Sequence, residues 1–267
     1  MSIFDPLFIG IDEFGHAVNL SLIYRNILIG GEPGAGKSSL LNTVVGHAAL
    51  CYDTDLVLID GKQVELGLWR DCADVFVGPN LDHAIDTLER LQAVMDNRYT
   101  FLLDHRRQKI EKADDIRCIL LAIDELAYFS ATVGTETEQK YFSALNRDIA
   151  ARGRAVGIID ASATQRPSSD IIPTSLRFLF GWRWAGRCVD DSSSDVVLGH
   201  GWAAKNFSAA RIDPNNRGEG LLLAHGGVPM SMKGAHMSNT DIIRVADYAA
   251  CIRRGRAELV AEMRAAA

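Results

Sequence analysis

The sequence lacks an apolar run long enough to cross a bilayer, which takes about 18 to 20 residues. Its start, MSIFDPLF, shows neither the basic stretch nor the small-residue cleavage site of a secretory signal peptide. These absences predict a cytoplasmic chain that does not itself insert into a membrane. Internal repeats, low-complexity tracts and long linkers are also missing, so we expect a single domain over residues 1–267.

Paired cysteines of the CxxC kind are missing too. The five cysteines, at 51, 72, 118, 188 and 251, are scattered, which argues against a zinc site and against a disulfide framework. A net charge of −6 argues against a protein whose whole surface binds nucleic acid, although a local basic channel is compatible with that average. With 48% hydrophobic residues, the chain has enough apolar side chains for a substantial core.

Short apolar runs alternate with helix-like segments, a pattern typical of parallel sheets joined by crossover helices. The predicted strands lie at 27–29, 56–60, 119–124, 157–163 and 179–184, and the predicted helices at 81–111 and 136–154. A turn at 212–220 leads into a short apolar segment that we predict to be an edge strand. Residues 241–267 are a candidate helical appendage. The expected fold class is α/β, with a mainly parallel central sheet flanked by helices.

The stretch GGEPGAGKSS contains the phosphate-loop pattern GxxxxGK[ST], placed between a predicted strand and a predicted helix. Its glycines allow backbone N–H groups to face phosphates; Lys37 is expected to reach the β- and γ-phosphates and Ser38 to ligate Mg²⁺. The predicted nucleotide-binding residues are Gly31, Glu32, Pro33, Gly34, Ala35, Gly36, Lys37, Ser38 and Ser39. The alternative is a glycine-rich turn that matches the pattern by chance.

An acidic pair, Asp124 and Glu125, follows the apolar run at 119–123, where α/β sheets present groups to their ligands. We expect Asp124 to hold the Mg²⁺ shell and Glu125 to orient or deprotonate the attacking water. The alternative is a pair of acidic residues that only opens a helix. A guanine-reading NKxD motif is missing, so ATP is the expected nucleotide.

Further segments, in order along almost the whole chain, resemble the FtsK/SpoIIIE-type DNA translocases. They are GIDEFG at 10–15, LIDGKQVEL at 58–66, LAIDELA at 121–127, the stretch from ARGRAVGI to ATQRP at 151–167, SDVVLG at 194–199 and TDIIRVA at 240–246. The SDVVLG segment is most similar to the actinobacterial plasmid-transfer and integrative-element branch. Three departures from the family pattern stand out. Gly61 replaces a proline, which leaves the rigidity of that loop open, and Asp195 replaces an arginine, so that position cannot supply an arginine finger. Asp160, Ala161 and Ser162 stand at usually bulky apolar positions, which is compatible with either a polar contact or a loosened core.

The resemblance implies a RecA-like P-loop NTPase that forms a ring, expected to be a hexamer, around double-stranded DNA and couples ATP hydrolysis to translocation. Gln165 is then a candidate sensor of the γ-phosphate or the attacking water; the alternative is a polar residue that caps the turn before Pro167. Such rings place an arginine of one subunit at the γ-phosphate of the next. Arg152 and Arg183 are the preferred candidates, ahead of Arg154 and Arg187; for each, a surface ion pair is the plain alternative.

Other functions stay open. A related ring ATPase that moves protein cargo in specialised secretion agrees with the acidic composition. A nucleotide-gated adaptor that scarcely hydrolyses ATP is disfavoured because Lys37, Ser38, Asp124 and Glu125 are all present. The sequence shows no membrane anchor and no clear winged-helix domain, which makes a membrane-anchored partner a candidate for anchoring or loading the motor.

The run RFLFGWRWAGR at 177–187 interleaves aromatic residues with arginines, which is compatible with base stacking. Phe178, Phe180, Trp182 and Trp184 share one parity, however, so on a strand they would line one face. We therefore interpret them as core residues.

Overall fold

A computed structural model describes residues 1–224 and 226–265, including side chains as far as Gly255. The strands are β1 (Leu7–Asp12), β2 (Ala17–Leu20), β3 (Asn26–Gly30), β4 (Thr54–Ile59), β5 (Val75–Val77), β6 (Cys118–Ile123), β7 (Ile158–Thr164), β8 (Phe180–Gly186), β9 (Glu219–Ala224) and β10 (Met230–Gly234). They form one ten-stranded sheet in the order β2-β1-β10-β9-β8-β3-β7-β6-β4-β5.

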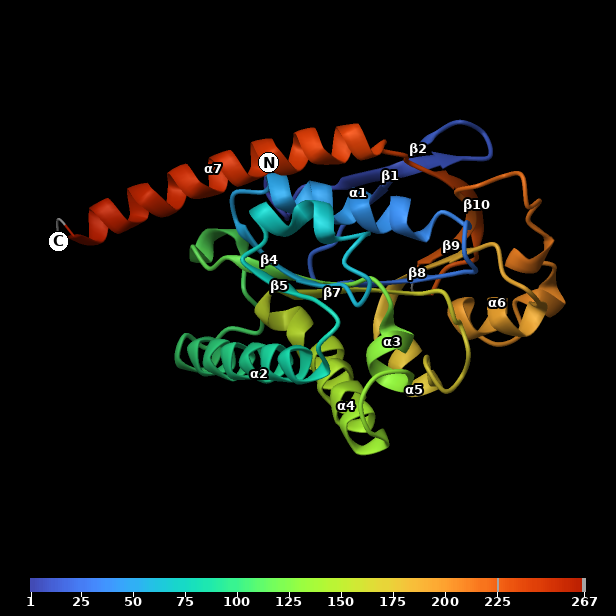
Figure 1. Cartoon of the computed structure of the whole chain (residues 1–267), viewed down its shortest axis with the longest axis horizontal. Helices are drawn as coiled ribbons and strands as arrows, with labels where there is room; N and C mark the ends of the chain where they lie inside the picture. The colour runs from blue at the N-terminus through green and yellow to red at the C-terminus, as the bar shows by residue number, and fades with distance from the viewer. Residues whose placement is uncertain (225, 266–267) are drawn as a thin grey trace.

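The helices cover both faces of this sheet (Figure 1). They are α1 (Lys37–Leu50), α2 (Leu81–Asp104), α3 (Leu126–Ala131), α4 (Glu136–Arg152), α5 (Thr174–Arg177), α6 (Asp191–Leu198) and α7 (Asn239–Ala265). Short 3₁₀ turns lie at Gly67–Cys72 (η1), Lys112–Asp114 (η2), Gly153–Val156 (η3), Ala203–Lys205 (η4) and Ala209–Arg211 (η5). Helices α1 and α7 lie on one face, and α2 to α6 lie on the other (Figure 1).

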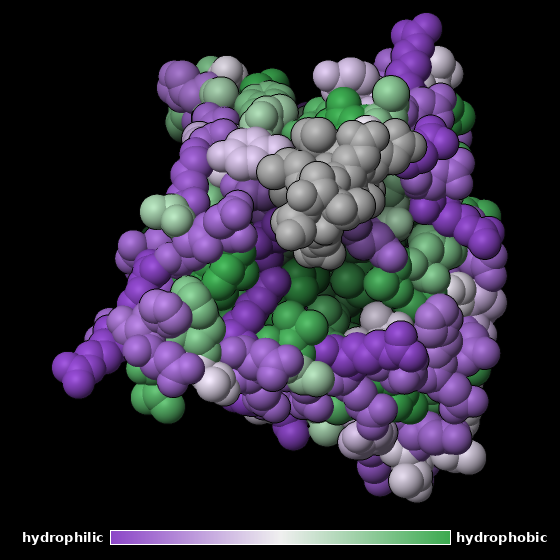
Figure 2. Space-filling model, turned by 90° about the vertical axis from the view of Figure 1, so that its left-hand side faces the viewer, coloured by the Kyte–Doolittle hydropathy of each residue, from purple (hydrophilic) through white to green (hydrophobic). Residues whose placement is uncertain are grey.

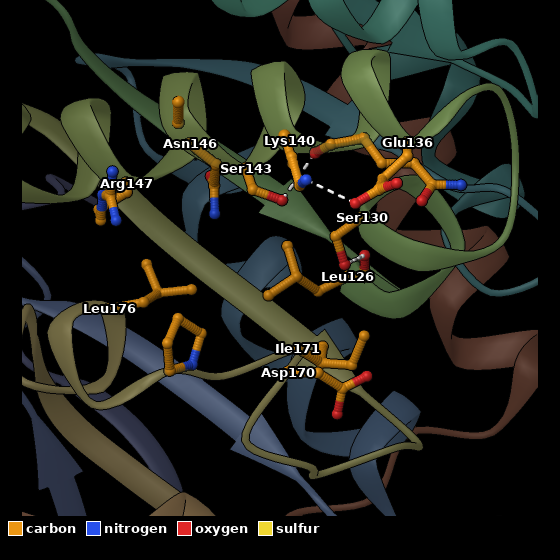
Figure 3. A pocket seen from close by; sticks show the side chains of 13 residues that line it. Leu126, Ser130, Glu136, Lys140, Ser143, Asn146, Arg147, Asp170, Ile171 and Leu176 are labelled. Carbon is orange, nitrogen blue, oxygen red and sulfur yellow. Dashed lines mark hydrogen bonds and ion pairs between the residues drawn. The ribbon is translucent and has the colours of Figure 1, made fainter.

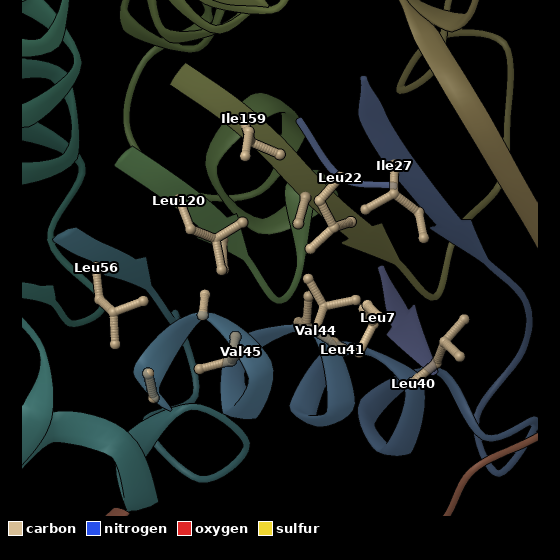
Figure 4. Packing of buried hydrophobic residues seen from close by; sticks show 14 of the residues in the cluster. Leu7, Leu22, Ile27, Leu40, Leu41, Val44, Val45, Leu56, Leu120 and Ile159 are labelled. Carbon is tan, nitrogen blue, oxygen red and sulfur yellow. The ribbon is translucent and has the colours of Figure 1, made fainter. Parts of the chain in front are cut away.

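Side chains of the sheet and of the two helix layers pack together in two apolar cores, one on each face of the sheet. On the first face, α1 packs side chains such as Leu41 and Val44 against Leu120 and Ile159 of the central strands (Figure 4). Successive residues of a strand point to opposite faces of the sheet. Ile27 and Ile29 of β3 therefore belong to the first core, whereas Leu28 belongs to the second core, under α2, α4 and α6. Burial on both faces is why the parallel strands read as continuous apolar runs.

The expected fold class is confirmed: all five predicted strands exist, as β3, β4, β6, β7 and β8, and neighbours among them pair in parallel. Two predictions about the bounds and positions of these elements were wrong. The segment at 219–224 is not an edge strand, because β9 pairs with both β8 and β10. The first long helix ends at Asp104 rather than near 111, where Arg106 adopts a φ of 53° that no helix accommodates.

The C-terminal segment, a candidate appendage from its sequence, is helix α7, and its first half packs on the domain. Ile242, Ala246, Ala249 and Ala250 are buried in the first core. Farther along, Arg253 donates to the carbonyl oxygens of Ala49 and Thr54 at 3.2 and 2.8 Å and pairs with Asp74. These contacts join α7 to the end of α1, whose last carbonyls lack helical partners.

The surface is largely hydrophilic in the view of Figure 2, with apolar residues gathered in a central recess. Within the described residues, no helix combines the length and the apolar character that a bilayer crossing requires.

The polar residues of β7 form a buried contact rather than a loosened core. The Ser162 hydroxyl donates to Asp160 Oδ1 at 2.6 Å, and the backbone N–H of Asp160 donates to Asn26 Oδ1 at 3.0 Å. Asp160 Oδ2 has no hydrogen-bond partner among the described residues, and no cation compensates the carboxylate. Burial therefore raises the pKa of Asp160 to about 7, although the Ser162 hydrogen bond opposes this rise.

This carboxyl group makes stability depend on pH. Its folded pKa lies above its unfolded value of about 4, so its contribution is fully present at low pH and is lost as pH rises towards 7. The free energy of unfolding of the wild type should fall by about 1.4 kcal/mol per pH unit, relative to Asp160→Asn, between roughly pH 4 and pH 7. Urea unfolding of both proteins across this range tests it; parallel pH profiles would contradict the assignment.

Candidate nucleotide site

The phosphate loop, residues 31–38, connects the carboxyl end of β3 to α1. Gly31, Gly34 and Gly36 have φ values of 151°, 82° and 102°, which only glycine adopts readily. No described side chain caps the start of α1 at Gly36, so the first N–H groups of the helix are available. A loop of this shape ahead of a helix N-terminus suits a phosphate chain.

Lys37 begins α1 and is almost completely buried. Its Nζ donates to the carbonyl oxygen of Glu32 at 3.4 Å, which folds the side chain back over the loop. Burial lowers the pKa of Lys37, and the carboxylates of Glu125 and Asp124 act in the opposite direction. The phosphate loop and the acidic pair therefore lie close enough to interact, as the two motifs predict.

Asp124 follows β6 directly and is buried at the same edge of the sheet. Its backbone N–H donates to Ile59 O at 3.1 Å, while its Oδ2 atom has no hydrogen-bond partner among the described residues. Burial, followed by the nearby carboxylates of Asp60, Glu65 and Glu125, raises the pKa of Asp124 to about 7. An orphaned oxygen in this acidic surrounding fits a bound cation, which would favour the charged form.

Glu125 is held by the end of the neighbouring strand β7. The Thr164 hydroxyl donates to Glu125 Oε1 at 2.7 Å, and the backbone N–H of Gln165 donates to Oε2 at 3.0 Å. The sequence alternative of a helix cap is also realised, through a longer 3.4 Å bond from the Ala127 N–H to Oε1. Thr164 was missed by sequence reasoning, and Gln165 contacts Glu125 through its main chain rather than its amide.

A fourth strand end, that of β4, supplies Asp60. This fully buried carboxylate accepts four backbone N–H groups of the loop that follows, from Lys62, Gln63, Glu65 and Leu66, at 2.8 to 3.0 Å. The absence of the expected proline therefore does not leave this loop unsupported. Gly61 is required for another reason: a Cβ atom there would meet Tyr128 Cδ1 at 2.4 Å.

The phosphate loop borders a cavity of about 760 Å³, whose other wall comes from the far end of the sequence. The lining residues are Pro33, Gly34, Gly36, Lys37, Ser38, Ser39, Glu65, Gln165, Arg217, Gly218, Lys233, Gly234, Ala235 and His236. The Gly218 N–H donates to Ala35 O at 3.1 Å, and a Cβ on Gly36 would lie 2.6 Å from Gly218 Cα. Arg217, Lys233 and His236 could not be predicted from the sequence as part of this cavity, because no motif marks them.

The arginine candidates are not part of this cavity within one chain. Arg152 lies at the amino end of β7, opposite the phosphate loop, and pairs with Asp148 and Asp96 at 2.7 and 2.9 Å. Arg183 is buried in β8, which lowers the pKa of its guanidinium to about 10. Arg187 pairs with Glu32 of the phosphate loop itself. Burial counts against Arg183 reaching a neighbouring subunit, and the identity of a trans arginine stays a prediction.

Comparison with known proteins agrees with this geometry. The profile of the FtsK/SpoIIIE family matches residues 8–118. The DNA translocase FtsK of Staphylococcus aureus is 26% identical over 280 residues, which covers 97% of this chain and 32% of that protein. The chain therefore spans about a third of the length of the curated relatives it matches.

Solved structures share the fold. The pCW3 conjugation coupling protein TcpA has a TM-score of 0.74 at 21% identity, covering 90% of this chain and 70% of that one. The cytoplasmic domain of the Thermomonospora curvata type VII secretion ATPase EccC has a TM-score of 0.69 at 21% identity, covering 89% of this chain and 30% of that one. Together with the profile match and the aligned translocases, these structures show that the chain is similar to FtsK/SpoIIIE-type P-loop ATPase domains.

Proposed function

We propose that this chain is an ATP-hydrolysing motor that works as a ring, expected to be hexameric, and moves double-stranded DNA. Its setting would be plasmid or integrative-element transfer or chromosome segregation. The observation that carries the proposal is the position of Glu125, fixed by Thr164 and Gln165 beside the buried Lys37. The DNA translocases aligned with 97% of the chain, and the fold shared with a conjugation coupling protein, support DNA as the cargo.

The residues at the site fit ATP and Mg²⁺. The phosphate-loop N–H groups and Lys37 would hold the phosphates, and Ser38 with Asp124 would hold the metal shell. When bound, Mg²⁺ would neutralise phosphate charge and orient the γ-phosphate for attack. The orphaned Asp124 oxygen is the feature of this structure that a cation would satisfy.

Glu125 is suited to orient the attacking water and to accept its proton. Its carboxylate is already positioned by the Thr164 hydroxyl and the Gln165 N–H, so the orientation costs little when substrate binds. Gln165 borders the same cavity, which supports its role as a sensor of the γ-phosphate. A trans arginine from a neighbouring subunit would add positive charge in the transition state.

A motor that moves over any sequence must contact mainly phosphates, so its DNA binding should weaken steeply with salt. We place the motor in the cytoplasm, with a membrane-anchored partner as a candidate for loading. The second candidate is a ring ATPase that moves protein, since the secretion ATPase EccC shares the fold and the net charge is −6.

Steady-state ATP hydrolysis with and without linear double-stranded DNA, at low and moderate salt, separates these functions. We expect at least a tenfold stimulation by DNA that declines as salt rises, because each neutralised phosphate adds to the salt dependence. Hydrolysis by assembled protein that is indifferent to DNA would favour protein cargo. No hydrolysis under any condition would contradict the motor itself.

A further inference from the structure

A second cavity, of about 420 Å³, lies beside the nucleotide site, between α3, α4 and the segment 170–176 (Figure 3). Its volume falls within the range of ligand pockets. Its apolar lining consists of Leu126, Ala144, Ile171, Pro173 and Leu176, and its polar lining includes Ser130, Ser143 and Asn146. Leu126 directly follows Glu125, so one wall of this cavity is continuous in sequence with the residue proposed to orient the attacking water.

Asn146 is the unusual member of the lining. Only 1% of the residue is exposed, and neither its amide nitrogen nor its amide oxygen has a hydrogen-bond partner among the described residues. In Figure 3 the side chain extends from α4 towards the cavity. Leaving a buried amide unpaired destabilises the folded chain, because its desolvation is not compensated by hydrogen bonds. A peptide unit, with one N–H and one C=O, is the chemical complement of this side chain.

The rim of the cavity carries one charge that stands out. Lys140 pairs with Glu136, and Asp170 pairs with Arg166. Arg147, next to Asn146, is exposed and has no ion-pair partner in the described part of the chain. The cavity therefore suits a peptide segment that presents an apolar side chain beside an acidic one.

The tip of the β1–β2 hairpin is such a segment. Phe14 is 75% exposed, and the neighbouring Glu13 is exposed without an ion-pair partner among described residues. The tip is preorganised, because Asp12 Oδ1 accepts the N–H groups of Phe14 and His16 at 2.9 and 2.8 Å. A rigid exposed aromatic residue is the kind of anchor that dominates protein interfaces.

The two features cannot meet within one chain. The hairpin occupies the β2 edge of the sheet, on the side of α1 and α7 in Figure 1, whereas α3 to α5 lie on the opposite side. A contact between the tip of one copy and the cavity of another is heterologous, and such contacts form a ring when the rotation between neighbours closes. It therefore needs nothing beyond the ring that the proposed function requires.

We propose that the hairpin tip of one subunit docks into the α3–α4 cavity of its neighbour, resting on the ring assembly of the proposed function. The Phe14 ring packs on Leu126 and Leu176, the Glu13 carboxylate pairs with Arg147, and a main-chain amide of the tip pairs with Asn146. Since the cavity walls lead to Glu125 and, through the segment after Pro167, to Gln165, the docked neighbour stabilises the hydrolytic arrangement. Hydrolysis is thereby favoured in assembled subunits.

Sedimentation of the full chain with a non-hydrolysable ATP analogue measures this contact. Phe14→Ala should weaken self-association by about 30-fold, as loss of an interface anchor does. Glu13→Arg and Arg147→Glu should each weaken it by about tenfold, and the combined swap should restore it to within about threefold of wild type. Leu103→Ala and Arg90→Glu, equally exposed changes on α2, serve as controls that leave association unchanged.

Asn146→Leu separates docking from folding. Removing an unpaired buried amide should raise the melting temperature of the dilute protein, while loss of the peptide contact weakens association. The docking proposal would be overturned if Phe14→Ala, Asn146→Leu and each single charge reversal, Glu13→Arg and Arg147→Glu, all assembled as the wild type does, even if DNA-stimulated hydrolysis supports the motor. If the wild type hydrolysed no ATP but the combined charge swap restored assembly, the motor proposal would be rejected and the docking proposal would stand.

Discussion

The variant Glu125→Gln is expected to bind ATP as the wild type does but to hydrolyse it about 10²- to 10⁴-fold more slowly, the usual contribution of a positioned general base. Loss of basicity is one reason. The other is geometric: Thr164 and Gln165 donate hydrogen bonds to the two oxygens of this carboxylate, which has no donor of its own. A glutamine amide would turn its NH₂ group towards one of these donors, so the side chain would also lose its orientation.

Single-turnover hydrolysis and equilibrium binding of a fluorescent ATP analogue measure the two effects separately. Glu89→Gln, the same change on the exposed face of α2, is the matched control and should retain wild-type turnover. Hydrolysis that persists in Glu125→Gln would assign the water-orienting role to another residue of the cavity.

Lys37→Ala is expected to weaken ATP binding by about 10- to 100-fold and to reduce turnover below detection, because a charge-assisted hydrogen bond to phosphate is lost inside a buried site. The remaining side chain could not reach from α1 across the loop as the ammonium group does. The affinity for AMP should change much less than that for ATP, since Lys37 is expected to contact the outer phosphates.

Calorimetric titration with ATP and with AMP makes this comparison, and Lys109→Ala, an exposed lysine far from the phosphate loop, is the control. Equal losses for both nucleotides would indicate a collapsed loop rather than a lost phosphate contact. Undiminished hydrolysis would contradict the phosphate-loop assignment.

The parallel half of the sheet could be predicted from sequence because each strand is buried on both faces and is therefore continuously apolar. The antiparallel half could not. Strands β1, β2 and β10 expose alternate residues, and the interior position of β9 depends on its pairing with β10 rather than on its own residues.

The aromatic run in β8 shows a further limit. Pairing with β3 shifts register between Asn26 and Ile27, so Phe180 packs in the second core while Trp184 packs in the first. Phe178 precedes the strand and is 60% exposed. Parity along the sequence cannot reveal such an irregularity, because it arises from the partner strand.

At the candidate site, residues within a motif were predictable, and residues brought in by tertiary packing were not. The pattern GxxxxGK[ST] and the acidic pair after β6 directed attention to Lys37 and Asp124 because their chemistry requires that spacing. Thr164 differs from any other strand-end threonine only through its contact with Glu125. Likewise, the close approach of the Tyr128 ring to Gly61, where a Cβ atom would lie 2.4 Å from Cδ1, is not visible in the sequence.

The close approach of Gly36 to Gly218 has a mechanical consequence. The Gly234 N–H donates to Gly218 O at 2.8 Å, and on β10 the Lys233 carbonyl would lie 2.0 Å from a Cβ placed on Gly10 of β1. Main chain thus touches main chain from the phosphate loop to the base of the β1–β2 hairpin, with no rotatable side chain between. Such a connection is stiff, so a displacement of the loop by phosphate would be passed on to the hairpin instead of being absorbed by rotamer changes.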